Sequence, residues 1–189
     1  MYCTLEAVKR LLDITGSEKD DELYGLMLSV KSEIDDYCDR SFGKETATRY
    51  FDGIGNNLVV DDIVSVSALK LDLDGDGVYE KTMASDDYVL WPYNESPKWM
   101  IKLSYDSDYS SFACGIPRGV EIAGVWGYSS VPRAVQQSAI EMTCRAYRQS
   151  QGSYGTEIGT PDIGTTTVFQ GMSADVRRKL NPFVRRTFG

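Results

Sequence analysis

Residues 20–42 (DDELYGLMLSVKSEIDDYCDRSF) constrain the fold more than any other stretch of the chain. Their apolar side chains recur at steps of three and four residues: Leu23, Met27, Val30, Ile34 and Tyr37. This is the period of one face of an α-helix, whereas a strand alternates with a period of two. The opposite face carries acidic and other polar residues and can contact water. We therefore expect a long amphipathic helix, capped by Ser17, whose apolar face is covered by other parts of the chain.

Two further segments have helical periodicity. Residues 4–15 begin with the capping residue Thr4, and the apolar residues that come after it lie on one face. We expect a short helix here that stops at Thr15-Gly16. Residues 131–149 begin with a Val-Pro pair, and proline suits the first turn of a helix. This third segment has two apolar rows, so we expect the long helix on one side and the sheet or a second subunit on the other. Together the segments predict a three-helix bundle.

Residues 46–128, between the second and third helices, predict an antiparallel β-sheet. Segments rich in Val, Thr and Tyr alternate there with Asp-Gly, Gly-Asn and Asp-Asp pairs, which are typical of turns. The predicted strands are 46–51, 57–60, 64–73, 87–91, 99–105 and 119–128. The fold class is therefore α+β, with the sheet inserted into the helical bundle.

Residues 150–189 differ from the rest in composition. Residues 150–171 are so rich in Gly, Ser and Thr that we expect a flexible linker, and a loop of this length is unusual in a compact domain unless it has a function. Residues 173–180 can form two helical turns capped by Ser173. We therefore predict a body, residues 1–149, and an extended C-terminal docking arm within 150–189.

The net charge of −8 is unevenly distributed along the chain. Residues 173–189 contain five basic residues and one acid, a net charge of +4, which leaves −12 for residues 1–172. Binding of nucleic acid needs clustered Lys and Arg, so we do not expect this chain to work by gripping DNA. An acidic body with a basic end indicates an acidic partner or a second copy of the chain.

The sequence contains no run of about 18 apolar residues, and its N-terminal residues are charged where a signal peptide needs an apolar block. We expect a soluble protein made in a cytoplasm, with no membrane partner. The four cysteines form no CxxC pair and histidine is absent, so neither a zinc site nor a disulfide framework is expected. Free and mostly buried thiols fit this pattern best.

The sharpest local motif is the acidic segment 72–80, DLDGDGVYE. Its spacing matches the first part of a calcium loop, with Asp72, Asp74, Asp76, Val78 and Glu80 as candidate ligands. The twelfth position of such a loop needs a bidentate glutamate, and here it is Met83. Asp-Gly between strands is also a common hairpin turn. A calcium site and a plain acidic turn both stay open, and the missing twelfth ligand favours the turn.

No pattern in the sequence predicts catalysis. Adjacent carboxylates such as Asp35-Asp36 do not face each other on a helix. The Ser, Thr and Cys residues lack a histidine base, and neither a Gly-x-Ser-x-Gly motif nor a phosphate-binding glycine loop is present. We expect a protein that is not an enzyme and has no cofactor, apart from the calcium alternative. A carboxylate metalloenzyme would require three acids to converge on a divalent ion.

Several aromatic residues could instead form a stacking platform for a ligand: Trp91, Tyr93, Trp99, Tyr105, Tyr109 and Phe112. Cross-strand packing is the simpler interpretation for Trp99 and Tyr105, which share the apolar face of one predicted strand. The platform and the acidic segment together define an alternative function, a calcium-dependent binding module with an aromatic ligand platform.

The order of these elements resembles the small head–tail connector, or adaptor, proteins of long-tailed bacteriophages. The matching segments are LEAVKRLLDI (5–14), residues 20–42, DYVLWPYNESPKWMIKL (87–103), GVWGYSSVPRAVQQSAIEMTCRAYR (124–148) and VRRKLNPFVRR (176–186). Only their order, with the Gly-Tyr…Val-Pro helix start and the Leu-x-Pro-Phe ending, is distinctive. The resemblance implies a non-enzymatic structural protein that forms a ring, usually of twelve copies, below the portal protein.

The resemblance further implies a place in the virion neck after assembly in the host cytoplasm, with a stopper or tail-completion protein as the other partner. Another neck or tail-completion role is the alternative within the same class. DNA would pass through the ring without sequence-specific binding. Residues 152–171 would be the tether of the arm. The implied portal-binding residues are Arg177, Arg178, Lys179, Phe183, Arg185, Arg186 and Phe188.

Overall fold

The computed structural model describes residues 1–151 and 172–185 of the 189-residue chain. The chain divides into two compact units, a helical unit (Met1–Arg40 and Val131–Gly189) and a sheet unit (Ser41–Ser130). The sheet unit is inserted into the sequence of the helical unit, between its second and third helices. The fold is therefore a mixture of α-helices and one antiparallel sheet, as the sequence predicted.

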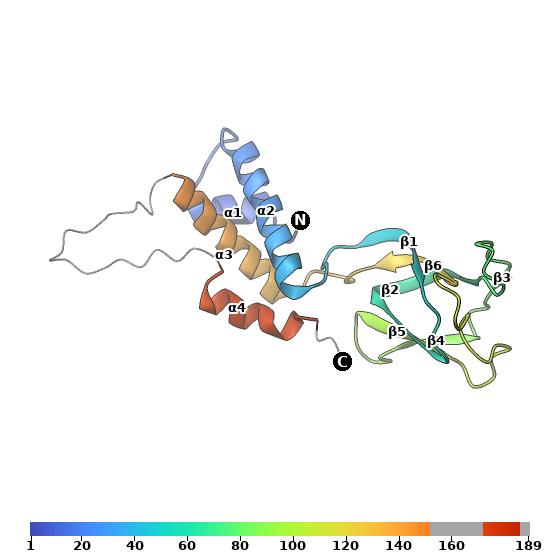
Figure 1. Ribbon diagram of the computed structural model, residues 1–189. Helices are drawn as coiled ribbons and strands as arrows, with labels where there is room; N and C mark the ends of the chain where they lie inside the picture. The colour runs from blue at the N-terminus through green and yellow to red at the C-terminus, as the bar shows by residue number, and fades with distance from the viewer. Residues whose placement is uncertain (152–171, 186–189) are drawn as a thin grey trace, which may run out of the picture. The chain divides into compact units, whose positions relative to one another are not determined.

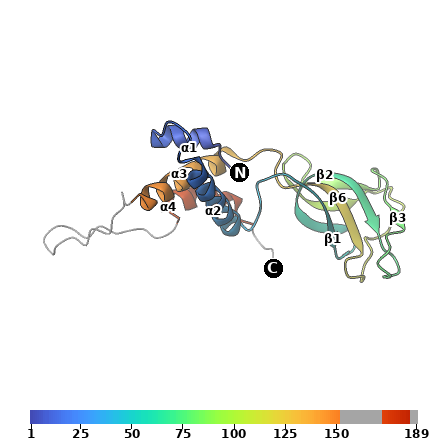
Figure 2. The same ribbon diagram turned by 90° about the horizontal axis from the view of Figure 1, so that it is seen from above.

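The described residues of the helical unit form four α-helices, α1 (Leu5–Leu12), α2 (Asp20–Cys38), α3 (Arg133–Ser150) and α4 (Ala174–Leu180), and a short 3-10 helix, η1 (Asn181–Phe183). α3 contacts each of the other three α-helices, and α1 also contacts α2 (Figures 1 and 2). The three predicted helices are present. A bundle of only three helices is not confirmed, because α4 covers a further side of α3.

α1 begins where the sequence predicted. The Oγ1 atom of Thr4 accepts a hydrogen bond from the backbone N–H of Ala7 at 3.3 Å, which satisfies a free donor of the first turn. The helix ends at Leu12, before the predicted stop at Thr15-Gly16, because Asp13 adopts a left-handed conformation with φ of 57°.

α2 is the predicted long helix, although it ends at Cys38 rather than at residue 42. Its buried residues lie on one face: Leu23, Met27, Val30, Ile34 and Cys38. Asp39 ends the helix, because its φ of 49° turns the chain and its N–H donates back to carbonyls of the last turn. The predicted Ser17 cap is wrong, since the N-cap residue is Lys19 and it makes no side-chain capping bond.

α3 has apolar side chains on more than one side, as its two apolar rows predicted. The long helix α2 covers one side, and α1 and α4 cover others, in place of the predicted sheet or second subunit. On α4, the side chains of Val176 and Leu180 are 1% and 0% exposed. Residues 172–185 therefore include a helix that packs on α3, whereas the sequence predicted an extended arm. Residues 152–171 and 186–189 of that arm lie outside the described residues.

The sheet unit contains one antiparallel sheet of six strands: β1 (Glu45–Phe51), β2 (Asn57–Leu71), β3 (Lys81–Thr82), β4 (Tyr88–Trp91), β5 (Lys98–Leu103) and β6 (Val120–Trp126). The strand order is β1-β6-β2-β5-β4, and the short β3 pairs with β2 (Figure 1). The central position of β2 explains its length, since its first part pairs with β5 and its second part with β6.

The sequence predicted two strands, 57–60 and 64–73, where the structure has the single strand β2. The prediction placed a turn at Asp61-Asp62, but the chain continues through this pair with shifts in register around Ile63. Such irregularities bend a strand without ending it. At the bend, the N–H of Gly127 donates to the carbonyl of Asp62 at 2.7 Å, so the backbone there keeps a partner.

The core of the sheet unit is made of residues of its strands, of the residue after β3 and of the loop before β6: Leu58, Val60, Ile63, Leu69, Leu71, Met83, Ile101, Phe112, Ala113, Val120, Ile122 and Trp126. The prediction for Tyr105 is wrong, because β5 ends at Leu103 and the Tyr105 side chain beyond it is fully exposed, at 101%.

All four cysteines are free, and Cys38 and Cys144 are buried. Burial raises the pKa of the Cys38 thiol to about 11, so this thiol stays protonated at neutral pH. The sequence predicted that most of the thiols are buried, and Cys114 is an exception because it is exposed. No helix in residues 1–151 and 172–185 combines the length and the apolar composition that crossing a membrane requires.

Replacing the Leu180 side chain by alanine tests whether α4 is part of the folded helical unit. Because this side chain is fully buried, Leu180→Ala should lower the free energy of unfolding by about 2–5 kcal/mol. Urea unfolding followed by circular dichroism at 222 nm measures the change. Arg178→Ala, at an exposed position of the same helix, is the control and should change the value by less than about 0.5 kcal/mol. Equal stabilities of the two variants would show that α4 does not stabilise the unit.

Candidate functional site

The predicted docking residues of α4 differ in how far they are exposed to solvent. Ser173 caps the helix, its Oγ accepting from the N–H of Val176 at 3.4 Å, and the buried Val176 and Leu180 fix the helix on α3. Arg177 and Arg178 therefore point away from the core and are exposed. Arg178 makes only a surface ion pair, with Asp175 at 3.0 Å, which restrains it weakly.

The remaining described docking residues contact other parts of the helical unit through an ion pair, a backbone hydrogen bond or partial burial. The Nζ atom of Lys179 pairs with Glu141 of α3 at 2.5 Å. Phe183 and Arg185 are half-buried, and the backbone N–H of Arg185 donates to the carbonyl of Cys38 at 2.9 Å. Arg186 and Phe188 lie outside the described residues. The structure thus presents Arg177 and Arg178 as the exposed cations of the predicted set.

The acidic segment 72–80 brings its predicted carboxylates together. One carboxylate oxygen from each of Asp72, Asp74, Asp76 and Glu80 lies within 4.8 Å of the others. Asp72 is buried, and the other three are exposed. Met83, the twelfth position, is buried in the core and supplies no oxygen. The four carboxylates fit a hard cation such as calcium, which prefers oxygen ligands.

The loop also stabilises itself through its own backbone. The carboxylate of Asp72 accepts from the N–H groups of Gly75 at 2.7 Å and Gly77 at 2.9 Å. Burial alone would raise the pKa of Asp72, but these backbone hydrogen bonds outweigh it and lower the pKa below its ordinary value. The ionised Asp72 therefore stabilises the turn at neutral pH, and this contribution is lost as the pH falls through the lowered pKa of Asp72.

A surface pocket of about 290 Å³ adjoins this loop. Its lining includes Tyr50 and Tyr79, whose ring centroids are 5.8 Å apart, and Arg118, whose guanidinium lies 4.6 Å from the centroid of the Tyr50 ring. The Tyr79 hydroxyl donates to the Arg118 carbonyl at 2.8 Å, so the pocket wall is held by a contact between the loop before β3 and the loop before β6. These aromatic residues were not among those the sequence proposed.

The aromatic residues that the sequence did propose do not share one exposed surface. Phe112 is fully buried and Tyr109 packs against the core of the sheet unit. Trp91 and Trp99 contact each other edge to face, with their ring centroids 4.6 Å apart. Tyr93 and Tyr105 are exposed. The six residues therefore do not form the single platform that the alternative function requires.

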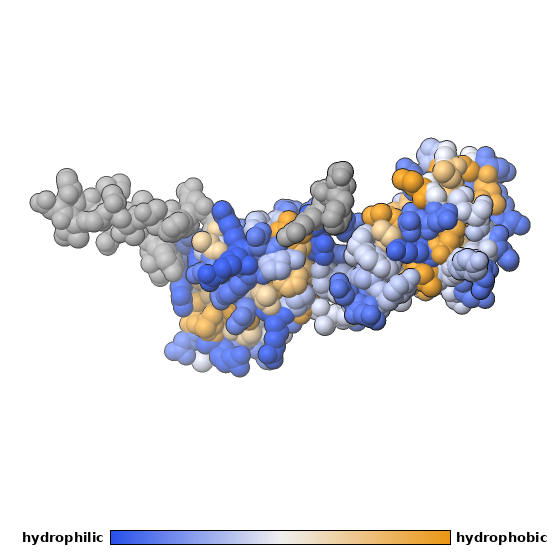
Figure 3. Space-filling view, turned by 90° about the horizontal axis from the view of Figure 1, so that it is seen from below, coloured by the Kyte–Doolittle hydropathy of each residue, from blue (hydrophilic) through white to orange (hydrophobic). Residues whose placement is uncertain are grey.

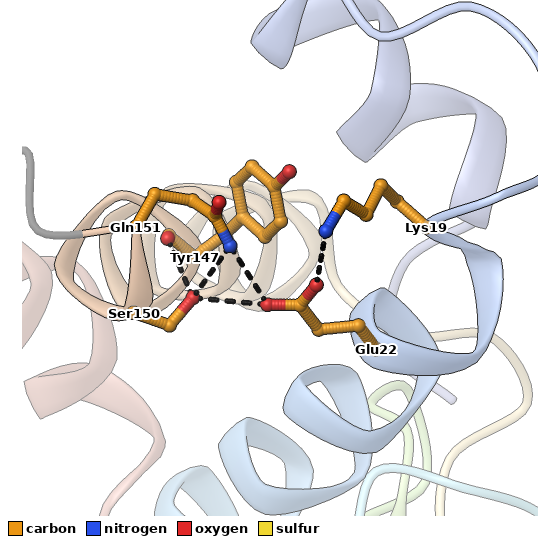
Figure 4. Close-up of polar contacts among 5 residues, drawn as sticks. All are labelled: Lys19, Glu22, Tyr147, Ser150 and Gln151. Carbon is orange, nitrogen blue, oxygen red and sulfur yellow. Dashed lines mark hydrogen bonds and ion pairs between the residues drawn. The ribbon is translucent and has the colours of Figure 1, made fainter.

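Glu22 of α2 joins the start of that helix to the end of α3 (Figure 4). Its carboxylate accepts from Lys19 at 3.2 Å, from Ser150 at 3.1 Å and from Gln151 at 3.0 Å. The hydrogen bond from Lys19 is the main cause of the lowered pKa of Glu22. These contacts fix the point at which the chain leaves α3, and no local pattern in the sequence predicts them.

Two exposed apolar surfaces of the helical unit were also not predicted from the sequence. Tyr24 and Leu28 of α2 are 52% and 46% exposed, and Leu11 of α1 is 54% exposed. In Figure 3, hydrophobic residues form separate patches on the surface among hydrophilic ones. The signal was present in the sequence, because Tyr24 and Leu28 are four residues apart and fall outside the buried stripe of α2.

The fold is similar to that of chains in three solved structures of gene transfer agent (GTA) particles. For the neck of the empty GTA particle computed with C6 symmetry, the TM-score is 0.59 at 14% identity, and the match covers 96% of this chain and 89% of that chain. For the neck of the native GTA particle computed with C12 symmetry, the TM-score is 0.53 at 18% identity, with coverage of 89% and 85%.

For the virion of the native GTA particle, the TM-score is 0.55 at 18% identity, with coverage of 93% and 82%. No protein-family model matches the chain, and no curated protein matches it. The structural likeness spans both units, so the insertion of the sheet unit belongs to the shared fold. It shows that this chain shares its fold with chains of these neck and virion particles.

Proposed function

We propose that the protein is a structural subunit of the neck of a tailed phage or phage-like particle. In this proposal several copies, twelve by the resemblance, form a ring between the portal protein and a stopper or tail-completion protein, and DNA passes through the ring. The chain acts by assembly and not by catalysis. The observation that carries the proposal is the likeness in fold to chains of symmetric neck particles over nearly the whole chain.

The charge distribution supports a ring through which DNA passes. The chain has a net charge of −8, and the acidic residues predominate outside the C-terminal segment. A surface of carboxylates cannot replace the counterions on phosphate, so DNA would move past it without being held. The exposed side chains of Arg177 and Arg178 are then available for a protein partner with acidic groups.

The exposed face of α4 supports docking on the portal. Arg177 and Arg178 project from a helix whose other face is anchored by Val176 and Leu180, so binding them costs little ordering of the backbone. Arginine is also among the residues that contribute most to protein interfaces. α4 can dock in this way while it stays packed on α3, and a detached arm is not needed.

Reversing the two exposed charges tests this docking. Arg177→Glu/Arg178→Glu should weaken binding to the portal protein of the same particle by at least about tenfold, because two cations at the interface become anions. The measurement is the binding curve in a pull-down with purified portal protein. The melting temperature should stay unchanged, since both side chains are exposed.

The matched control is Arg133→Glu/Arg148→Glu, which makes the same change in charge at two exposed positions of α3. This control should bind the portal protein like the unaltered chain. If both double variants bind equally well, α4 is not the docking surface.

The acidic loop supports a second, subsidiary function, the binding of a calcium ion by Asp72, Asp74, Asp76 and Glu80, with the Val78 carbonyl as a further ligand. The convergence of four carboxylate oxygens within 4.8 Å favours it, because a cation would relieve their mutual repulsion. The absence of a twelfth ligand predicts weak binding, in the range of about 10⁻⁴–10⁻³ M that extracellular calcium modules show.

Calcium should therefore raise the melting temperature of the protein at millimolar concentrations, and Asp74→Asn should abolish the rise by removing an exposed ligand. Asp86→Asn, at an exposed position outside the loop, should retain it. Differential scanning calorimetry with and without calcium measures the effect. A melting temperature that calcium leaves unchanged would assign the loop to the plain acidic turn.

A further inference from the structure

The outer face of α2 carries an apolar ridge. Tyr24 and Leu28 are four residues apart, about 6 Å along the helix axis, and both are exposed. Asp21 lies on the same face, three residues before Tyr24. We call these three residues the α2 ridge. Exposed apolar side chains of this size, next to each other on one face, are typical of an interaction surface.

A groove of about 330 Å³ lies between α1 and α3 of the same unit. Its lining consists of Ala7, Arg10 and Leu11 of α1 and Gln137, Ile140 and Glu141 of α3. Leu11, Ile140 and Ala7 make it largely apolar, and Arg10 is exposed at its rim. Its volume is at the small end of the range of about 300–1,000 Å³ for ligand sites, so it suits a few side chains.

The ridge and the groove lie on different sides of α1. Lys9, on one side of α1, pairs with Asp20 of α2 at 2.6 Å. Leu11, on the other side, faces α3 in the groove. The α2 ridge therefore cannot fill the groove of its own chain. It can fill the groove of another copy.

The charges beside the two surfaces are complementary. Among the described residues, neither Arg10 at the rim of the groove nor Asp21 on the ridge has an ion-pair partner, although the neighbouring Lys9 and Asp20 are paired with each other. A ridge seated in the groove of a second copy would bring an unpaired anion to an unpaired cation.

We infer that the α2 ridge of one copy binds the α1–α3 groove of the next copy, with Asp21 opposite Arg10. The contact is head to tail, because the two surfaces are different patches of the same chain. Repetition of such a contact closes into a ring when the rotation between copies divides a full turn. This inference rests on the proposed ring and names the surfaces that build it.

Two complementary variants test the head-to-tail contact. Leu28→Glu alters the ridge and leaves the groove intact, whereas Leu11→Glu alters the groove and leaves the ridge intact. Each variant alone should self-associate at least about 30-fold more weakly than the unaltered chain, because a charge is buried at the centre of the contact. An equimolar mixture should form a complex of two chains and nothing larger, since only one contact per pair remains.

The masses are measured by analytical ultracentrifugation over a range of concentrations. Ser29→Glu is the matched control, because it introduces the same charge at an exposed position on another side of α2 and should associate normally. Exchange of the rim charges gives an independent readout. Arg10→Asp and Asp21→Arg should each weaken association about tenfold, and the double variant should restore it.

The outcomes separate this inference from the proposed function. If the unaltered chain associates and the two Leu→Glu variants associate equally well, the inference is overturned and the ring is built by other surfaces. If only Leu11→Glu weakens association, something other than the α2 ridge fills the groove, and the inference is again overturned. If the unaltered chain keeps the mass of one copy at every concentration, the ring itself is contradicted.

Discussion

The burial of α3 is the constraint on which the helical unit depends. This helix has buried residues around much of its circumference, among them Val135, Ala139, Met142 and Cys144, so a single neighbour cannot cover it. Its polar residues are adapted to this setting: the hydroxyl of the buried Thr143 donates to the carbonyl of Ala139, one turn earlier, at 2.7 Å. α1, α2 and α4 each supply one apolar face to the same central helix. The chain must return after the sheet unit and again after residue 171 to complete this core.

This arrangement determines which surfaces remain for partners. Each outer helix uses its buried stripe on α3, and its other face contacts solvent. On α4 that face is basic, on α2 it carries Tyr24 and Leu28, and beside α1 it borders a groove. One packed core therefore offers several different outward surfaces. The proposed ring would require contacts both with copies of this chain and with unlike neighbours, and separate surfaces suit that requirement.

The sequence was sufficient to predict the elements whose pattern is local. The apolar period of α2, the Thr4 cap of α1 and the Val-Pro start of α3 all depend on near neighbours in the chain, and all three are found in the structure. For the same reason the strands β1, β4, β5 and β6 were predicted within about two residues of their observed ends, whereas β3 was not predicted and β2 was predicted as two strands. The spacing of the acidic residues left a calcium loop open as an alternative to a plain turn, and in the structure carboxylate oxygens of Asp72, Asp74 and Asp76 lie within 4.8 Å of one another.

The predictions that failed depend on distant contacts. The Asp61-Asp62 pair looks like a turn, yet it lies within β2 because that strand has partners on both sides that hold it through the bend. Tyr105 fits the alternation of β5, but the strand ends before it. Val176 and Leu180 are too few to indicate a packed helix by themselves, and only the open side of α3 explains their burial. Tyr50, Tyr79 and Arg118 meet across the sheet unit, which no local spacing reveals.

The proposed role of this chain is that of a repeated subunit in the neck of a particle. Electron cryomicroscopy of the purified particle tests this role, because the helical and sheet units can be recognised in the density by their folds. We expect several symmetry-related copies around the axis of the neck, adjacent to the portal protein. Purified, DNA-filled particles in which the chain is absent from the neck would contradict it.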